Sequence, residues 1–258
     1  MFIERINYGW RMLATGFSFA CFFGGGLFLA LTVFPVIAIA APDPYRRVRM
    51  TQWVIHRTFR FYLTMLEVLG ILTISVRGGE RLGDGQGRLV IANHPTLLDV
   101  VILMALLPRV QCIVKSELWR HRYLGGVVRW AGYIRNDLEP DAMIAACKDA
   151  IAEGRSVIVF PEGTRSRPGE PLQFRRGFAN IALLAGVETQ LIVIDCQPVM
   201  LCKGDPWWKI PPRKSNFRVT VGDRIEPIVL EPDQYRSIAA RRLVRRLEDY
   251  YTEQLAHG

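Results

Sequence analysis

A long stretch without charge near the start of the chain limits its possible folds more than any other feature. Residues 12–41 contain no ionised side chain, and arginines lie on both sides of them. Because about 20 apolar residues let a helix cross a bilayer, this stretch predicts a membrane-anchoring helical segment. Gly24, Gly25 and Gly26 interrupt its middle. Two arrangements fit: a single tilted span, or a hairpin that turns at the glycines and stays in one leaflet.

The end of this stretch, Ala38-Ile39-Ala40, also resembles a signal-peptide cleavage site. We favour a retained anchor, because the apolar core of a signal peptide usually has only about 7–15 residues. Arg46, Arg47 and Arg49 follow directly and favour the cytoplasmic side. We therefore expect a protein of the bacterial inner membrane whose remaining residues lie on the cytoplasmic side.

A second apolar stretch, residues 59–74, contains Glu67 and is short for a span. Aromatic residues and arginines mix in and just before its first half, which fits an interfacial amphipathic helix and equally a helix that faces a core. Glycines then punctuate the chain up to position 87. We accordingly expect three parts: membrane-associated helices in residues 1–78, a main domain in residues 79–234 and a basic helical tail in residues 235–258.

Strand and helix patterns alternate after the glycines. Buried strands are predicted at residues 88–92, 110–114, 156–160, 191–194 and 217–221, and helices at residues 96–107, 141–153 and 177–185. This alternation implies an α/β domain with a largely parallel central sheet flanked by helices.

The formal net charge of +9 suits an anionic partner, such as lipid headgroups, nucleic acid or a phosphorylated substrate. Trp207 and Trp208 stand beside basic residues, as in an interfacial loop. The sequence has no nucleic-acid-binding motif, so we expect membrane lipid and no nucleic acid as a partner. None of the five cysteines forms a Cys-x-x-Cys pair, and we expect no metal site.

A polar segment containing His94 and Asp99 follows the predicted strand 88–92, and open α/β sheets place their sites at the carboxyl ends of strands. Pro95 suits the first turn of a helix, which places Asp99 about one turn inside it and within reach of His94. Asp99 is alone among apolar residues, and a buried carboxylate needs a partner. A His–Asp pair fixes the imidazole tautomer and leaves a base, although a pair that merely caps the helix fits equally well.

The segment Phe160-Pro161-Glu162-Gly163-Thr164-Arg165-Ser166 follows another predicted strand. Gly163 permits close approach of the backbone to a ligand. Arg165 offers a planar fork for phosphate or carboxylate, and three further arginines follow it by position 176. This cluster points to an anion site rather than to a polar surface turn.

Asn-His-x-x-x-x-Asp followed by Phe-Pro-Glu-Gly-Thr-Arg-Ser resembles the glycerolipid acyltransferases, typified by 1-acylglycerol-3-phosphate acyltransferase. The resemblance covers roughly residues 89–199. It implies an acyltransferase-type fold, a catalytic role for the main domain, and no cofactor. The implied reaction is O-acyl transfer from acyl-CoA or the acyl carrier protein thioester, acyl-ACP, to a hydroxyl of a lysophospholipid-like acceptor. It further implies that His94 is the general base and that Asp99 orients it. The implied substrate-binding residues are Lys115, Arg135, Glu162, Gly163, Thr164 and Arg165.

One departure from the family leaves the acceptor open. The family's second block commonly reads Gly-x-Ile-x-x-Asp-Arg, whereas Leu138 stands here in place of the final arginine, and Arg135 is a candidate substitute. Another lipid or an aryl-polyene-type secondary metabolite therefore also fits as acceptor. No Gly-x-Ser-x-Gly elbow is present, which favours one-step transfer. A thioesterase, in which water replaces the acceptor, is the alternative reaction, and the sequence does not predict the oligomeric state.

Overall fold

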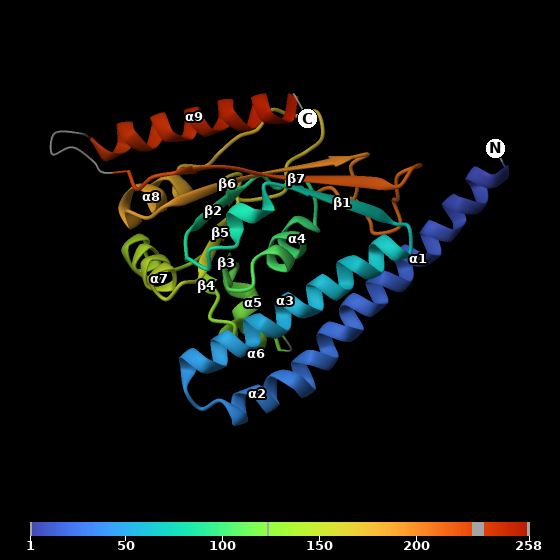
Figure 1. Ribbon diagram of the computed structural model, residues 1–258, viewed down its shortest axis with the longest axis horizontal. Coiled ribbons are helices and arrows are strands. Elements are labelled where there is room, and N and C mark those ends of the chain that lie inside the picture. The colour runs from blue at the N-terminus through green and yellow to red at the C-terminus, as the bar shows by residue number, and fades with distance from the viewer. Residues whose placement is uncertain (1, 123, 229–234, 257–258) are drawn as a thin grey trace.

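The computed structural model describes residues 2–122, 124–228 and 235–256. Its N-terminal part is an almost continuous helix made of α1 (Phe2–Phe28), a π-helical turn η1 (Leu29–Val33) and α2 (Phe34–Ala40). The three glycines lie inside α1 and do not turn the chain, so the hairpin that the sequence allowed at that point is not formed. The chain turns after α2 instead, and α3 (Pro44–Val68) runs back along α1 (Figure 1).

Local signals explain where α3 begins and how it pairs with α1. The Asp43 side chain accepts a hydrogen bond of 2.7 Å from the backbone N–H of Arg46, and Pro44 occupies the first turn, where an N–H has no partner. The ring of Phe22 on α1 stacks on Phe59 of α3, with centroids 6.2 Å apart. The two helices therefore form an antiparallel pair.

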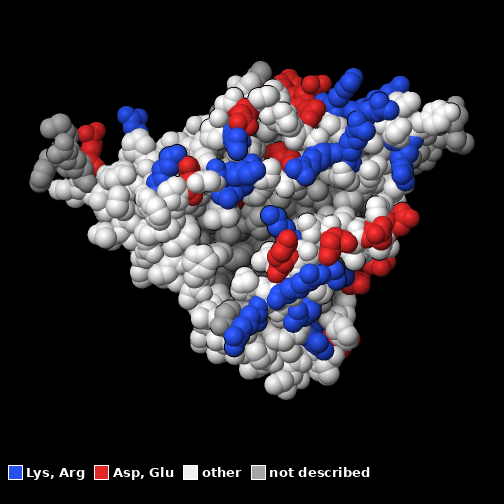
Figure 2. Space-filling model, turned by 180° about the vertical axis from the view of Figure 1, so that it is seen from behind, with Lys and Arg blue, Asp and Glu red and all other residues white. Residues whose placement is uncertain are grey.

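Much of this helical pair remains apolar and exposed. Figure 2 shows it as an uncharged surface along one side of the molecule, away from most of the Lys and Arg side chains. α3 faces the core with Leu63 and Leu66, as one of its two predicted roles required, and its Phe61 is exposed, so the interfacial role stays a prediction. The exposed large apolar side chains include Leu13, Phe17, Phe23, Phe28, Leu31 and Ile39 on α1–α2, and Trp53, Phe61 and Val68 on α3.

The described residues form a seven-stranded sheet in the order β1-β7-β6-β2-β5-β3-β4. β2, β3, β4, β5 and β6 run parallel, β7 is antiparallel to β6, and β1 is parallel to β7. The predicted α/β class with a largely parallel sheet is thus confirmed. The strands are β1 (Leu72–Arg77), β2 (Leu89–Ala92), β3 (Val110–Val114), β4 (Ile134–Arg135), β5 (Ser156–Val159), β6 (Thr189–Gln197) and β7 (Ser215–Ile225).

β1 was not predicted, because its residues continue the apolar stretch that α3 begins. Gly70 adopts a φ of 72°, which ends α3, and Leu72 then enters the sheet fully buried. Residues 1–78, expected to be only membrane-associated, therefore contribute an edge strand to the sheet.

Helices cover both faces of the sheet (Figure 1). α1, α3 and α4 (Asp99–Leu106) contribute to the core on one face, whereas α7 (Pro140–Ala152), α8 (Arg176–Ala185) and α9 (Arg236–Ala256) pack on the other. The predicted basic tail is the helix α9, which is amphipathic: Leu243 and Leu247 are buried, and Tyr251 donates a 2.7 Å hydrogen bond to the carbonyl of Ile91 on β2. Three shorter helices are η2 (Gly79–Leu82), α5 (Ser116–Arg120) and α6 (Leu124–Trp130).

Candidate active site

His94 and Asp99 form a hydrogen-bonded pair at the carboxyl end of β2. The Nδ1 of His94 lies 2.8 Å from the Oδ2 of Asp99. Asp99 is the first residue of α4, so the expectation that it lies one turn inside the helix is wrong. The hydroxyl of Thr96 explains the difference: it accepts from the N–H of Leu98 at 3.1 Å, which forms a tight turn before the helix. The Asp99 carboxylate reaches back across this turn to the imidazole.

Burial and hydrogen bonding set the chemistry of the pair. Asp99 is fully buried, and this burial raises its pKa against the opposing effects of His94 and Thr96. The backbone N–H and the hydroxyl of Thr96 donate to its two oxygens at 2.7 and 2.6 Å. The carboxylate favours the tautomer with a proton on Nδ1, which leaves the Nε2 of His94 as an acceptor. The His94 side chain is 15% exposed, so a substrate can reach that nitrogen.

Two further contacts hold this segment, and the sequence analysis did not single them out. The side chain of Asn93 pairs with the backbone of Ile194 on β6, through an Nδ2 to carbonyl bond of 2.8 Å and an N–H to Oδ1 bond of 2.7 Å. The ring of His94 stacks on Phe160, with centroids 4.1 Å apart. An amide and an aromatic residue placed directly at the ends of buried strands were the available signals in the sequence.

Glu162 supports the backbone of His94. It is 6% exposed, and its Oε1 accepts from the backbone N–H of His94 at 3.0 Å and from the hydroxyl of Ser166 at 3.0 Å. The backbone N–H of Ser166 in turn donates to the carbonyl of His94 at 2.8 Å. The two predicted polar segments are therefore joined on both sides of His94. The Oε2 of Glu162 is buried without a hydrogen-bond partner among the described residues.

Burial also raises the pKa of Glu162, and this makes a prediction about stability. A raised pKa means that the folded state holds the proton more tightly, so the stabilisation is present at low pH and is lost as pH rises above the ordinary value of 4.5. Glutamine does not titrate. We expect the free energy of unfolding of the wild type to fall relative to Glu162→Gln as pH rises, by at most about 1.4 kcal/mol per pH unit.

Urea unfolding of both proteins at several pH values between about 4.5 and 8 measures this difference. Glu170→Gln is the matched control, because Glu170 lies on the same loop but is exposed and pairs only with Arg167 at the surface. A constant difference between wild type and Glu162→Gln across the pH range would contradict the prediction.

Gly163, Thr164 and Arg165 form the loop that follows β5. Gly163 adopts a φ of 67°, and a Cβ at this position would lie 3.0 Å from the Cδ of Arg175. Arg165 donates from Nη1 to the carbonyls of Leu201 at 2.9 Å and Cys202 at 3.0 Å. Among the described residues its hydrogen bonds all use Nη1, which leaves Nη2 and Nε as donors for an anionic ligand. Thr164, between the two, is half-buried.

Lys115 and Arg135 lie farther along the same edge of the sheet. Lys115 is exposed and directly follows β3, whereas Arg135 is on the edge strand β4. At the usual strand spacing, β3 is about 10 Å and β4 about 14 Å from β2. Arg135 pairs with Asp137 at 2.7 Å and lies over the ring of Trp119. The structure therefore brings together His94, Asp99, Glu162 and Arg165, with Lys115 at their flank, but places Arg135 apart from them.

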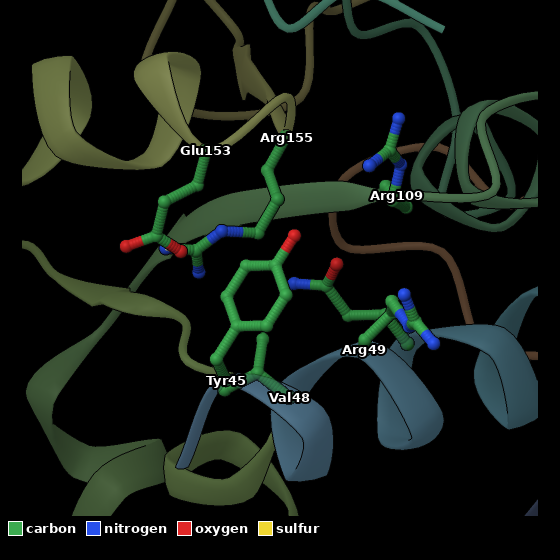
Figure 3. A pocket seen from close by; sticks show the side chains of 7 residues that line it. Tyr45, Val48, Arg49, Arg109, Glu153 and Arg155 are labelled. Carbon is green, nitrogen blue, oxygen red and sulfur yellow. The ribbon is translucent and has the colours of Figure 1, made fainter. Parts of the chain in front are cut away.

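Two concave regions lie outside this cluster. An open groove of about 550 Å³ is lined by Arg135 and Leu138, which stands where the family's arginine was expected. A second pocket lies between α3 and the amino ends of the strands, lined by Arg49, Arg109 and Arg155 among others (Figure 3). Arg109 and Arg155 directly precede β3 and β5, so this pocket is at the edge opposite to His94 and holds none of the predicted site residues.

Comparisons with known proteins identify the family of the chain. The sequence pattern of a family described as Acyltransferase matches residues 73–196, which include both polar segments. The chain is 31% identical over 190 residues to a 1-acyl-sn-glycerol-3-phosphate acyltransferase of Cocos nucifera, and it spans 56% of that protein's length. It is also 31% identical over 237 residues to 1-acyl-sn-glycerol-3-phosphate acyltransferase alpha of Bos taurus, covering 87% of this chain and 76% of the relative.

A solved structure shares the fold. The crystal structure of the 1-acyl-sn-glycerophosphate acyltransferase PlsC of Thermotoga maritima matches 96% of this chain and 98% of its own, with a TM-score of 0.66 at 21% sequence identity. The similarity thus extends over the N-terminal helices as well as the sheet. Given these sequence relatives, the chain belongs to the glycerolipid acyltransferase family of O-acyltransferases.

Proposed function

We propose that this protein transfers a fatty acyl group from an acyl-CoA or acyl-ACP thioester to the free hydroxyl of a 1-acylglycerol-3-phosphate, with His94 as general base. The observation that carries the proposal is the His94–Asp99 pair at the end of β2, with a buried carboxylate on Nδ1 and a reachable Nε2. The names of the relatives support the acceptor, since all those reported above act on 1-acyl-sn-glycerol-3-phosphate or 1-acyl-sn-glycerophosphate.

The proposed reaction proceeds in one displacement. Nε2 of His94 takes the proton of the acceptor hydroxyl while that oxygen forms a bond to the thioester carbonyl carbon. Asp99 stabilises the imidazolium that results. In this proposal, backbone N–H groups of the loop around Gly163 would stabilise the oxyanion of the tetrahedral intermediate. The carbon–sulfur bond then breaks, and the imidazolium returns its proton to the departing thiolate, so that an ester and a free thiol leave the site.

We further propose that the reaction takes place at the cytoplasmic face of a bacterial inner membrane. Residues 6–40 form a helical stretch that is long and apolar enough to cross a bilayer. Its most apolar 18-residue window has a mean hydropathy of 2.2, and only 17% of that window is buried in the protein. Basic residues directly follow this stretch and favour the cytoplasmic side. A membrane-bound enzyme of this kind would take a lipid acceptor directly from the bilayer.

Mass spectrometry of the products tests the function. Purified protein in phospholipid vesicles would receive one acyl-CoA or acyl-ACP together with a set of acceptors: 1-acylglycerol-3-phosphate, other lysophospholipids, or none. We expect acyl transfer to the lysophosphatidic acid and no release of free fatty acid without acceptor. Acyl release into water alone would identify a thioesterase, and transfer only to another lipid would identify a different acceptor.

Arg165→Ala is expected to raise the KM for the acceptor by roughly 10-fold or more, because a hydrogen bond to a charged group contributes about 1.5–3 kcal/mol. Initial rates with each substrate varied in turn measure this effect. The KM for the thioester donor should change little. Arg167→Ala is a matched control, because that arginine is on the same loop but pairs with Glu170 at the surface. Equal changes in both KM values would make Arg165 a residue of general structure.

A further inference from the structure

The loop between β6 and β7, residues 198–214, connects the N-terminal helix to the candidate active site. Its first part contacts the site, and its second part contacts α1. Hydrogen bonds to backbone carbonyls of the loop occur in both sets of contacts. The loop thus offers a physical path between two parts of the chain that are distant in sequence.

The contact with α1 depends on an arginine inside an apolar helix. Arg11 is 4% exposed, and its Nη1 and Nη2 donate to the carbonyls of Pro211 at 3.0 Å and Pro212 at 2.6 Å. Because proline has no N–H, neither Pro211 nor Pro212 can both donate and accept hydrogen bonds in a strand ladder, and their carbonyls accept from Arg11 instead. Burying a guanidinium requires such partners, because an unpaired buried charge is strongly destabilising. Arg11, which directly precedes the apolar stretch, therefore binds the loop between β6 and β7.

A tryptophan makes the second contact with α1. The ring of Trp207 lies against Gly16, where a Cβ would be 3.3 Å from the nearest ring carbon, and its centroid is 5.9 Å from that of Phe19. Gly16 thus leaves room for the ring. Trp207 and Arg11 thus both connect the same loop to α1.

The other end of the loop supports the site. Leu201 adopts a φ of 52°, a left-handed conformation that is uncommon for a leucine. Its carbonyl accepts from Nη1 of Arg165 and also from the backbone N–H of Leu97, at 3.3 Å, in the turn between His94 and Asp99. The carbonyls of Leu201 and Cys202 therefore determine the direction of the Arg165 guanidinium.

We propose that Arg11 is a positioning residue for acceptor binding, acting through the 198–214 loop on Arg165. The proposal rests on the function proposed above, and it makes α1 a structural part of the acceptor site as well as a membrane anchor. Arg11 holds the loop, the loop presents the carbonyls of Leu201 and Cys202, and these direct the free nitrogens of Arg165 toward the acceptor's phosphate.

Full-length Arg11→Met in phospholipid vesicles tests the proposal, because methionine keeps the helix apolar and removes the donors. With 1-acylglycerol-3-phosphate and an acyl-CoA as substrates, we expect the acceptor KM to rise about 10-fold, as for loss of a charged hydrogen bond, and the donor KM to stay constant. Arg11→Lys should restore part of the loss. In an Arg165→Ala background, Arg11→Met should cause no further rise, because residues that act through one contact are not additive.

Trp10→Phe is the matched control, since the side chain of Trp10 donates from α1 to the carbonyl of Leu69 at 2.9 Å, outside the 198–214 loop. It should leave the acceptor KM unchanged. Trypsin cleavage after Lys203, Arg213 and Lys214, without substrates, reports on the loop itself and should be faster in Arg11→Met than in Trp10→Phe.

An unchanged acceptor KM in Arg11→Met would overturn the proposal, as would an equal rise in Trp10→Phe or an additive rise in the Arg165→Ala background. A wild type that transfers no acyl group to any acceptor would overturn the proposed function and this role with it. The trypsin pattern would then still show whether Arg11 holds the loop.

Discussion

His94→Ala is expected to lower the rate of acyl transfer by about 10²- to 10⁴-fold, the usual contribution of a positioned general base. The acceptor hydroxyl would lose the group that takes its proton, whereas the neighbouring hydrogen bonds between the His94 backbone, Glu162 and Ser166 use main-chain atoms of residue 94 and remain available. Circular dichroism and initial rates of transfer, measured on the same preparations, check the result. Near-normal turnover with an intact fold would show that His94 is not the base.

Asp99→Asn extends this prediction to the partner of the imidazole. The asparagine amide would donate toward Nδ1 of His94 and so favour the tautomer that protonates Nε2, which removes the base. His56→Ala is the matched control for both variants. His56 is also buried, and its Nδ1 lies 3.0 Å from the carbonyl of Met104, toward the carboxyl end of α4, whereas Asp99 begins that helix. We expect that control to lower stability and to keep the turnover of the folded protein.

Membrane retention is the second large effect. The full-length protein is expected to stay with membranes in about 1 M salt, where the Debye length is only about 3 Å, and to leave with detergent. Screening weakens the attraction of arginines to lipid headgroups, but it does not affect the exposed apolar side chains of α1–α2. Sedimentation of salt-washed membranes followed by immunoblotting measures the retained fraction.

The structure shows which deletion tests the anchor. Leu63 and Leu66 on α3 and Leu72 on β1 are buried in the core, so removal of everything before the glycine-rich boundary would destroy the fold. Deletion of residues 2–40 removes α1, η1 and α2, and with them the buried Ala14, Phe34 and Ile37, but it leaves α3 and β1 in place, so circular dichroism of this variant accompanies the measurement. We expect this variant to bind membranes in a salt-sensitive way, through the exposed Trp208 and basic side chains. Release of the full-length protein by salt alone would contradict the anchoring role.

Periodic and apolar patterns predicted five of the strands of the central sheet, because these strands are wholly or partly buried apolar segments. β4 escaped prediction because it has only two residues, and β1 because α3 and β1 share one apolar stretch. The predicted start of α4 was wrong because the hydroxyl of Thr96 accepts from the nearby N–H of Leu98. The orientation of that hydroxyl depends in turn on its hydrogen bond to the carboxylate of Asp99. At the start of α4, a hydrogen bond between neighbouring residues thus outweighs the helical pattern of apolar residues that the prediction used.

The candidate site was predictable to the extent that it follows the ends of strands. His94, Asp99 and Glu162 follow or lie close to strand ends, and adjacent parallel strands bring them together. The supporting role of Glu162 was not predictable, because its bond to the His94 backbone joins residues 68 positions apart. The same holds for Arg165, whose carbonyl partners come from a loop that no motif marks.

The pairing of β1 with β7 has a consequence for synthesis on the ribosome. Thr73 and its partner Asn216 are separated by 143 positions, so at about 5–20 residues per second β1 is made roughly 7 to 30 s before β7. During this interval β1 has an unpaired edge, which is a hazard for aggregation. The preceding apolar helices are made earlier still, and in the proposed membrane-bound protein they would keep this strand beside the bilayer. Early insertion of the anchor would thus protect the nascent chain until its sheet closes.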